Sequence, residues 1–269
     1  MEKTVMITGA SRGIGLATVR LFQSRNWRVA ACVRNRAGNE WLGKIADLEV
    51  FELDVTKKSS IEKAVDEVKS KMGPIDVLVN NAGYGLIGAF EETPEEEIRS
   101  CFETNFFGAL NVIKAVLPAM RDARKGCIIQ IASVGGRLSF PLYSAYCATK
   151  WALEGFSESL AYELKEFGIK VKIVEPGPIN TDFHKESMHL IKPKSESSYA
   201  RFANRVIPNL IKAGESGPSP EKVAEVIYRA ANDGLPKLRY PVASRGMLFS
   251  KKVLTDATFI KMMRWILSR

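Results

Sequence analysis

Short apolar runs alternate along this chain with longer stretches in which apolar residues recur at helical spacing. Short continuous apolar runs are typical of buried strands, whereas apolar residues that recur every three or four positions are typical of helices. The pattern predicts strands at residues 4–7, 28–33, 48–53, 75–79, 126–132, 170–175 and 238–241. Strands that alternate with helices form a parallel sheet with helices on both faces. We therefore expect a doubly wound α/β fold of about seven strands, built as one domain over residues 1–243.

The first predicted strand leads into a turn that is rich in glycine. Residues 8–15 read Thr-Gly-Ala-Ser-Arg-Gly-Ile-Gly, and a helical pattern follows them. Glycines let the backbone approach a pyrophosphate, and the free N–H groups of a helix N-terminus attract its negative charge. The spacing differs from the Gly-x-Gly-x-x-Gly fingerprint of many dinucleotide-binding proteins. The turn therefore predicts a pyrophosphate site, and the alternative is a tight strand–helix turn that binds no ligand.

A second cluster of candidate chemistry lies near the middle of the chain. Tyr146 and Lys150 are four residues apart in a helix predicted over residues 146–167, so they share one face. An ammonium within about 4–6 Å favours an ionised phenol, so we expect Lys150 to lower the pKa of Tyr146 from about 10 toward neutrality. Ser133, thirteen residues before Tyr146, supplies a hydroxyl that can hold a carbonyl oxygen. Together the three side chains predict a proton donor for carbonyl reduction, or an acceptor for alcohol oxidation.

Four further stretches accompany the glycine turn and the Tyr-x-x-x-Lys pair. They are Asn-Asn-Ala-Gly at 80–83, Asn105 in Thr-Asn-Phe-Phe-Gly, Ser133 after the run 126–132, and Pro-Gly-Pro-Ile-Asn-Thr at 176–181. In this order the six motifs resemble the short-chain dehydrogenase/reductase family over roughly residues 3–242. The resemblance implies a single-domain Rossmann fold and an oxidoreductase that interconverts a carbonyl and an alcohol with a nicotinamide cofactor. No catalytic position of the family pattern is missing.

The resemblance also implies a role for each matching residue. It makes Tyr146 the general acid/base, Lys150 its partner and a ligand of the nicotinamide ribose, Ser133 the group that polarises the substrate oxygen, and Asn105 the group that positions a water in a proton relay. The implied cofactor-binding residues, besides Tyr146 and Lys150, are Thr8, Gly9, Ser11, Gly13, Ile14 and Gly15 at the pyrophosphate, Asp54 and Val55 at the adenine, Asn81, Ala82 and Gly83 on the adenosine side, and Pro176, Gly177, Ile179 and Thr181 at the nicotinamide.

The end of the second predicted strand indicates which nicotinamide cofactor binds. NAD enzymes of this fold place an acidic residue there for the ribose 2′-hydroxyl, whereas this chain has Val33 followed by Arg34. A guanidinium binds a 2′-phosphate through paired hydrogen bonds, and a carboxylate repels it. Arg12, inside the glycine turn, is a second candidate for the same phosphate. We therefore expect NADP(H); the alternative is that both arginines are solvated surface charges.

The segment 182–218 has little regular pattern before about Tyr199, and we expect it to cover the substrate as a lid at the carboxyl ends of the strands. Its apolar residues are Phe183, Met188, Leu190, Ile191, Tyr199, Phe202, Val206, Ile207, Leu210 and Ile211. They favour a hydrophobic substrate of the steroid, retinoid or aliphatic-ketone kind, and the chain's tail resembles those of steroid- and retinol-active family members. The alternative is a surface helix that only packs down.

Two other classes of function stay open from the sequence alone. One is an enzyme of the same fold with a different reaction, such as an enoyl reductase, an epimerase or a dehydratase. The other is a protein that binds NADP as a sensor without turning it over. The full set of catalytic groups favours carbonyl reduction over both.

The formal charge of +9 is concentrated in a basic amphipathic tail at residues 244–269. Residues 239–269 hold seven Lys and Arg against Asp256 alone, a balance of +6, among many apolar residues. A basic amphipathic helix can lie on an anionic membrane. It can also close the substrate pocket or pack against a second subunit. The chain has no recognisable module for nucleic acid.

The cysteines and histidines indicate a cytoplasmic protein without a metal site. The cysteines, which we expect to be core residues in a reducing compartment, are Cys32, Cys101, Cys127 and Cys147. His184 and His189 fall in one predicted loop without a partner cysteine. No apolar run approaches the roughly 18 residues that span a bilayer, and a glycine turn at residue 8 leaves no room for a secretory leader. The family resemblance implies a homodimer or homotetramer through helices at about 95–124 and 146–167.

Overall fold

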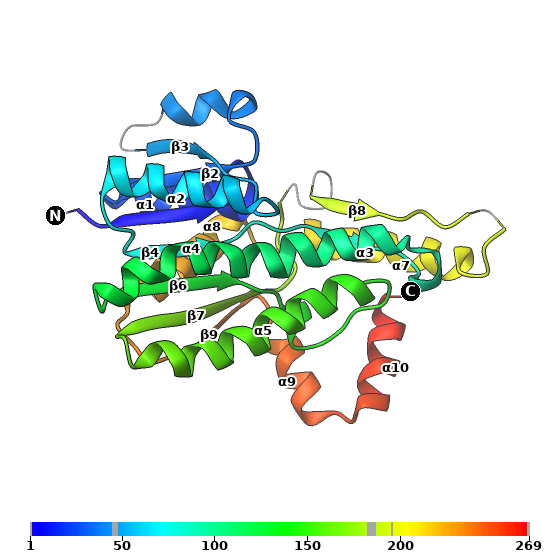
Figure 1. The fold of residues 1–269 in the computed structure, drawn as a ribbon. Helices are drawn as coiled ribbons and strands as arrows, with labels where there is room; N and C mark the ends of the chain where they lie inside the picture. Colours follow the sequence, from blue (N-terminus) through cyan, green and yellow to red (C-terminus); the bar gives the residue numbers. More distant parts are fainter. Residues whose placement is uncertain (1, 45–47, 182–186, 195, 268–269) are drawn as a thin grey trace.

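A computed structural model describes residues 2–44, 48–181, 187–194 and 196–267. Its centre is a seven-stranded sheet in the order β3-β2-β1-β4-β6-β7-β9, in which all neighbouring strands are parallel (Figure 1). The strands are β1 (Thr4–Thr8), β2 (Arg28–Val33), β3 (Leu48–Glu52), β4 (Val77–Asn80), β6 (Gly126–Ile131), β7 (Ile169–Pro176) and β9 (Arg239–Val242). The chain winds outward from β1 to β3 and then from β4 to β9 on the other side. The carboxyl ends of β1 and β4 therefore flank a crevice.

Helices cover both faces of this sheet. One face packs against α1 (Gly13–Ser24) and α8 (Pro220–Asn232), and the other against α2 (Lys58–Met72), α4 (Gly108–Asp122) and α5 (Ser144–Lys165). The remaining helical segments are η1 (Ala37–Lys44), η2 (Phe90–Glu92), α3 (Glu95–Phe102), the π-helical turn η3 (Glu103–Phe107), η4 (Val134–Gly136), α7 (Ala200–Glu215), α9 (Arg245–Val253) and α10 (Asp256–Leu267). Figure 1 shows α7, α9 and α10 gathered at the end of the molecule to which the strands point.

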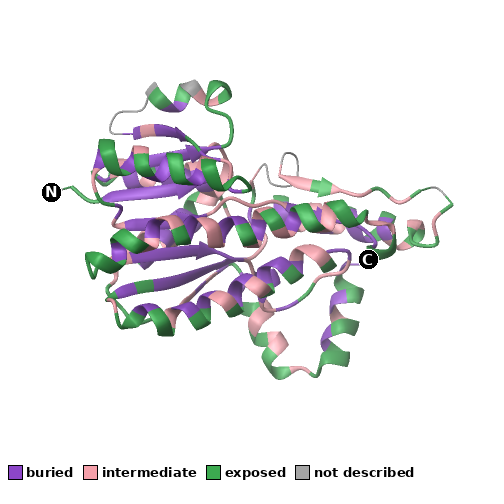
Figure 2. Cartoon of the chain, viewed as in Figure 1, coloured by how far each residue is buried: buried purple, intermediate pink, exposed green. Residues whose placement is uncertain are grey.

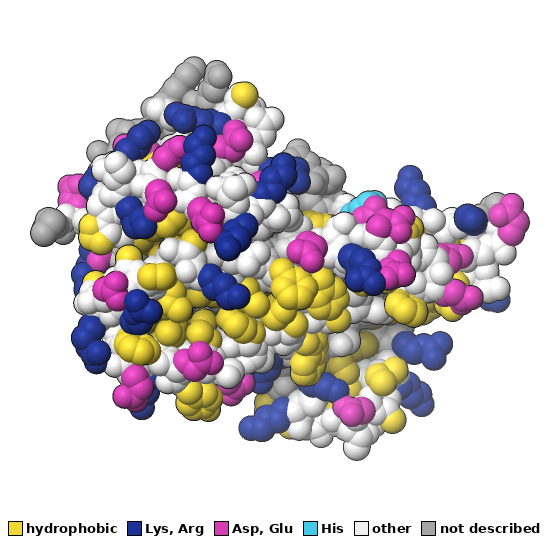
Figure 3. Space-filling model, viewed as in Figure 1, with side chains coloured by type: hydrophobic (Ala, Val, Ile, Leu, Met, Phe, Trp, Pro, Cys, Tyr) yellow, Lys and Arg dark blue, Asp and Glu magenta, His cyan; other side chains and the backbone are white. Residues whose placement is uncertain are grey.

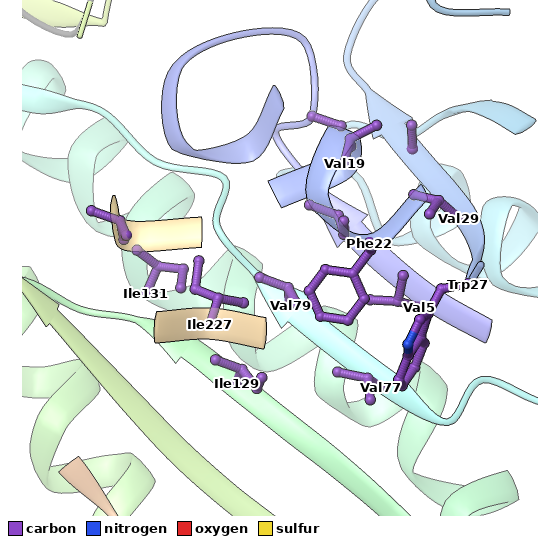
Figure 4. Packing of buried hydrophobic residues seen from close by; sticks show 14 of the residues in the cluster. Val5, Val19, Phe22, Trp27, Val29, Val77, Val79, Ile129, Ile131 and Ile227 are labelled. Carbon is purple, nitrogen blue, oxygen red and sulfur yellow. The ribbon is translucent and has the colours of Figure 1, made fainter. Parts of the chain in front are cut away.

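Alternate residues of each strand pack into opposite layers. Val5 of β1 packs with Phe22 of α1 and Ile227 of α8, whereas its neighbour Met6 packs with the helices of the other layer. Figure 2 shows the strands buried along most of their length. Because both faces are covered, the strands read in the sequence as continuous apolar runs. Figure 4 shows Phe22 between strand residues and Trp27, whose ring centroid lies 5.1 Å away in an edge-to-face contact.

The predicted α/β architecture and its seven strands are confirmed, with strand ends that differ by at most two residues. The pattern missed a second sheet, in which β5 (Gly85–Ile87) pairs in parallel with β8 (Met188–Leu190). Each of these strands has three residues, which is too short for a period to show. The helical region predicted at 95–124 is interrupted by the π-helical turn η3.

The C-terminal tail forms two helices rather than the single amphipathic helix considered from the sequence. Leu254, which follows α9, has extended backbone and separates it from α10. Phe259, Met263 and Leu267 of α10 are buried in one cluster with residues of α7, and the Asn209 side chain donates a hydrogen bond to the Leu267 carbonyl at 3.1 Å. Within the described residues, no helix has both the length and the apolar character needed to cross a membrane.

Candidate active site

The predicted site residues meet in one cavity of about 1110 Å³ at the carboxyl ends of the strands. Of all these residues, Thr8 and Asn105 alone are not part of its lining. The predicted residues that line it are Gly9, Ser11, Arg12, Gly13, Ile14, Gly15, Arg34, Asp54, Val55, Asn81, Ala82, Gly83, Ser133, Tyr146, Lys150, Pro176, Gly177, Ile179 and Thr181. Segments that lie far apart in the sequence therefore converge where the winding of the sheet reverses.

The glycine turn presents bare backbone to this cavity at the start of α1. Gly9 and Gly13 have left-handed backbone, with φ of +64° and +51°, which glycine adopts without strain. A Cβ on Gly15 would overlap the carbonyl oxygen of Gly9. Arg12 precedes α1 without a side-chain cap, and the first turn of α1 has no acidic residue. This helix end therefore fits an anion such as a pyrophosphate.

Thr8 supports the turn from beneath the cavity. Its buried hydroxyl accepts hydrogen bonds from the backbone N–H groups of Asn81 and Ala82, both at 3.0 Å. The Asn81 amide donates in return to the carbonyls of Thr8 and Gly9, also at 3.0 Å. These bonds tie the loop after β1 to the loop after β4. Contrary to the sequence-based expectation, Thr8 does not reach the cavity, and it acts here as a positioning residue.

One part of the cavity lining combines cations with a hydrogen-bonded carboxylate. Arg12 and the exposed Arg34 line it together with Asp54. Asp54 accepts hydrogen bonds from the backbone N–H and the hydroxyl of Thr56, at 3.0 and 2.7 Å. Partial burial raises the pKa of Asp54, but these hydrogen bonds and the charges of Lys57 and Arg34 outweigh it, so the pKa lies below its usual value. Arg12 and Arg34 thus bring two guanidinium groups to the same cavity as this carboxylate.

Ser133, Tyr146 and Lys150 line another wall of the same cavity. The Ser133 hydroxyl is hydrogen-bonded to the Tyr146 phenol and accepts a second hydrogen bond from the backbone N–H of Gly135 at 3.0 Å. The buried Lys150 ammonium donates to the carbonyl of Ile131 at 2.9 Å and lies 5.9 Å from the centroid of the Tyr146 ring. A carbonyl oxygen in the cavity can therefore meet a phenol and a hydroxyl at once.

The pKa of Tyr146 differs from the expectation drawn from the sequence. Burial raises this pKa above the ordinary value of 10.0, and the hydrogen bond with Ser133 offsets the rise only in part. Burial also lowers the pKa of Lys150 to about 8, because a low-dielectric environment disfavours the charged form. The expectation that Lys150 brings the phenol toward neutrality is therefore wrong, since burial has the larger effect. A phenol that keeps its proton at neutral pH suits donation to a substrate oxygen.

Asn105 lies beside this wall and is buried in the π-helical turn η3. Its Oδ1 accepts from the backbone N–H of Tyr84 at 2.9 Å, and its Nδ2 donates to the Tyr84 carbonyl at 2.8 Å and to the Thr149 hydroxyl at 3.2 Å. A Cβ on Gly83 would lie 3.0 Å from the Asn105 Oδ1 and 3.7 Å from the Lys150 Nζ. Asn105 thus anchors the backbone next to Lys150, and its part in a water relay stays a prediction.

A third wall comes mainly from the small sheet, α7 and the tail helices, and the expected lid residues Met188 and Leu210 belong to it. Its members include Tyr143, Met188, His189, Leu210, Met247, Met262, Met263, Ile266 and Leu267. Of the roles left open for the tail, closure of the pocket agrees with α10, because four of its residues line the cavity. Two residues expected in the lid, Phe183 and His184, lie outside the described residues.

The histidine that can be placed, His189, lies in this wall. His189 Nδ1 lies 3.0 Å from a carboxylate oxygen of Glu97. Over the residues that the structure describes, no three His, Cys, Asp or Glu side chains are grouped so as to hold a metal ion. All four cysteines are buried, as expected for core residues.

An ionic cluster with two buried carboxylates, Glu154 and Glu175, lies behind the wall that holds Lys150. Arg239 on β9 places its Nε 3.0 Å from a carboxylate oxygen of Glu154 on α5 and 3.4 Å from one of Glu175 on β7. Arg137, which follows η4, lies 3.0 Å from the same Glu175 oxygen. Burial and the neighbouring charge of Glu175 raise the pKa of Glu154. The cluster connects the segments that carry Ser133 and Lys150.

Comparison with known proteins gives several relatives. The model of the short chain dehydrogenase family matches residues 3–190. An uncharacterized oxidoreductase of Schizosaccharomyces pombe is 41% identical over 222 residues, which cover 81% of this chain and 92% of the relative. A 3-ketodihydrosphingosine reductase of Bacteroides thetaiotaomicron is 37% identical over 262 residues, which cover 97% and 92%. Retinol dehydrogenase 8 of Bos taurus is 35% identical over 254 residues, which cover 88% and 80%.

Several solved structures also resemble this chain. A short-chain dehydrogenase from Streptomyces avermitilis superposes with a TM-score of 0.83 at 35% identity, over 98% of this chain and 96% of the other. ElxO with NADP bound superposes with a TM-score of 0.75 at 26% identity, over 93% and 100%. A point variant of actinorhodin polyketide ketoreductase with NADPH gives 0.74 at 30% identity, over 90% and 95%. The match to the family model and the relatives above 30% identity show that the chain belongs to the short-chain dehydrogenase/reductase family.

Proposed function

We propose that this protein is an NADP(H)-dependent oxidoreductase that interconverts a carbonyl and an alcohol on a hydrophobic small molecule. The observation that carries the proposal is the convergence of Ser133, Tyr146 and Lys150 on the cavity onto which the glycine turn opens. Family membership and the oxidoreductases among its relatives support action on CH–OH and C=O groups.

NADP(H) fits the residues of the cavity. The start of α1 would hold the pyrophosphate, because helix N-termini attract anions and the first turn of α1 has no carboxylate to repel one. Arg12 and Arg34 would hold the 2′-phosphate. Two structural neighbours bind NADP or NADPH, which supports this choice. When bound, the cofactor supplies or accepts the hydride.

The chain's own residues handle the proton and the developing charge. In the reducing direction, Tyr146 donates its proton to the substrate oxygen. Ser133 donates a hydrogen bond to the same oxygen as negative charge builds on it. The Lys150 ammonium then stabilises the phenolate, and a proton from solvent restores the phenol. The raised pKa of Tyr146 keeps this proton in place at neutral pH.

The substrate would bind between the wall formed by Ser133, Tyr146 and Lys150 and the third wall, which is mostly apolar. Met188, Met247, Met262 and Met263 line that side of the cavity, and methionine side chains adapt their shape to apolar ligands. Relatives named for 3-ketodihydrosphingosine and for retinol agree with an apolar substrate. Residues 187–194, residues 196–218 and the tail would together cover it.

A homodimer or homotetramer is part of the same proposal. Phe107, Trp151 and Tyr162 are exposed by 44, 48 and 72% on η3 and α5, and Figure 3 shows a continuous hydrophobic area across this part of the surface. Contiguous apolar surface of this kind marks interaction sites. Light scattering of the protein and of Trp151→Glu tests this: the variant should have a lower mass.

The function is tested by NADPH consumption with hydrophobic ketones, α,β-unsaturated thioesters and buffer alone. We expect turnover with ketones and an alcohol product. Turnover with the unsaturated compounds alone would indicate an enoyl reductase. Tight NADPH binding without turnover on any ketone would indicate a sensor.

A further inference from the structure

The tail helices α9 and α10 have two faces of different character. Met262, Met263, Ile266 and Leu267 of α10 line the cavity, as do residues of α9. Ile266 lies on this cavity side and is still 48% accessible, so solvent reaches the cavity along α10. The opposite faces of both helices point away from the body of the molecule, from which the two helices project as a hairpin (Figure 1).

The outer face of the hairpin carries large apolar side chains. Phe249 and Val253 of α9 and Ile260 and Trp265 of α10 are exposed by 56 to 67%. Phe249 and Val253 are one helical turn apart and share a face of α9. Ile260 and Trp265 lie about 140° apart around α10, with Lys261 and Arg264 between them. Such clustering on two adjacent helices is unusual for a surface that only meets water.

Exposed basic residues are interspersed with these apolar side chains along both helices. They are Arg245, Lys252, Lys261 and Arg264, all of them exposed. Between residues 245 and 267 the sole acidic residue is Asp256, which is paired with Lys251. Figure 3 shows hydrophobic and basic side chains next to each other over this part of the molecule. We refer to the four apolar and four basic residues as the tail face.

We propose that the tail face docks on an anionic lipid bilayer. Exposed Trp, Phe and aliphatic side chains interspersed with Lys and Arg are suited to insertion among acyl chains and to anionic headgroups. A second copy fits the face less well, since a twofold contact brings the same patch against itself and would oppose its cations. The aromatic surface on α5 lies elsewhere and carries acidic neighbours such as Glu158 and Glu163.

Docking in this position has a consequence for the substrate, and this step rests on the proposed function. The helices that would touch the bilayer are the helices that line the apolar wall of the cavity. A substrate dissolved in the bilayer would therefore pass into the cavity alongside α10 without crossing bulk water. The substrate class is then a lipid that resides in the membrane.

Vesicle sedimentation tests the docking without using turnover. Purified protein is spun with vesicles of phosphatidylcholine mixed with phosphatidylglycerol, and with vesicles of phosphatidylcholine alone. We expect sedimentation with the anionic vesicles, and weaker binding as salt rises. Lys252→Gln/Lys261→Gln/Arg264→Gln should weaken binding about a hundredfold, since each basic residue near the surface contributes about fivefold. The control Lys58→Gln/Lys63→Gln/Lys69→Gln removes three charges from α2 and should bind like wild type.

The outcomes separate docking from catalysis. Absence of wild-type binding to anionic vesicles, or equal loss in the tail and control variants, overturns the docking. A lower oligomer mass for the tail variant in light scattering would assign the face to a second copy and would also overturn it. If docking holds but no ketone is reduced, the proposed function fails on its own. For a bilayer-borne ketone, the tail variant should lose rate while keeping its rate on a water-soluble ketone.

Discussion

The hydroxyl of Ser133 and the phenol of Tyr146 are joined by a hydrogen bond that links the end of β6 to the first turn of α5. The backbone N–H of Gly135 holds the same hydroxyl from the other side at 3.0 Å. The two groups are therefore assembled in advance at the cavity surface. Preorganised donors of this kind stabilise a transition state with little reorganisation.

Ser133→Ala should lower kcat for ketone reduction about a hundredfold, since one hydrogen bond to a developing oxyanion is worth a few kcal/mol. The Kd for NADPH should stay nearly the same. Stopped-flow kinetics and NADPH fluorescence titration give the two values. Ser139→Ala, a change at an exposed position nearby, is the control and should keep its rate. An unaltered kcat in Ser133→Ala would remove this serine from the mechanism.

Arg34→Asp should shift cofactor preference from NADPH toward NADH. The change removes charge-assisted hydrogen bonds to a 2′-phosphate and adds a repelling carboxylate, so the ratio of kcat/KM values should fall about tenfold to a hundredfold. The control is Arg36→Asp, which introduces the same charge two residues later, at an exposed position that does not line the cavity. Equal ratios for wild type and Arg34→Asp would contradict the assignment.

The rate of reduction should fall as pH rises through about 8, because the pKa of Lys150 lies there. Above that pH the amine is neutral and no longer stabilises the phenolate of Tyr146. Lys150→Arg keeps its charge, so its pH profile should lose this decline although its rate is lower. The profile of kcat/KM between about pH 6 and 10 measures the effect. A decline of equal position in the arginine variant would point to another group.

The free energy of unfolding should fall as pH rises from 4.5, the ordinary pKa of a glutamate, into the neutral range, because of the Glu154 carboxyl. Its pKa is raised on folding by burial and by Glu175, so the folded chain binds more protons than the unfolded chain in that window and unfolding becomes easier with pH. Glu154→Gln should therefore flatten the pH dependence of the unfolding free energy, measured by urea titration.

Glu158→Gln is the matched control for this stability experiment. Glu158 lies one turn further along α5 and contacts the same Arg239 at 2.8 Å, but that contact lowers its pKa. Its removal should not flatten the slope. Equal slopes in wild type and Glu154→Gln would show that the buried carboxyl does not titrate in this range.

The fold was predictable because its determinants are local. The strands are buried on both faces and read as apolar runs, and Gly13 and Gly15 mark the start of α1. Strand β8 was not predictable, because its three residues pair with β5 about a hundred positions earlier. The break between α9 and α10 was also hidden, since no glycine or proline marks Leu254.

Residues of the candidate site that belong to sequence motifs were predictable. Properties that depend on burial in the folded protein, such as a pKa, were not. Spacing and family resemblance indicated Tyr146 and Lys150, but not that burial outweighs their proximity in setting the phenol's pKa. Thr8 was expected to contact the cofactor and instead supports the cavity through backbone hydrogen bonds. The motif also did not indicate that Asn105 holds the backbone of Tyr84. The third wall, which holds several methionines, has no sequence motif, because any apolar helix face can line a cavity.

The central claim is that the phenol of Tyr146 supplies the proton during hydride transfer from NADPH to a hydrophobic ketone. Its most direct test is single-turnover oxidation of NADPH by the wild type and by Tyr146→Phe, with the Kd for NADPH measured in parallel. We expect the phenylalanine variant to bind NADPH normally and to oxidise it at least a hundredfold more slowly, the lower limit for a positioned acid. NADPH oxidation by the variant at the wild-type rate would contradict it.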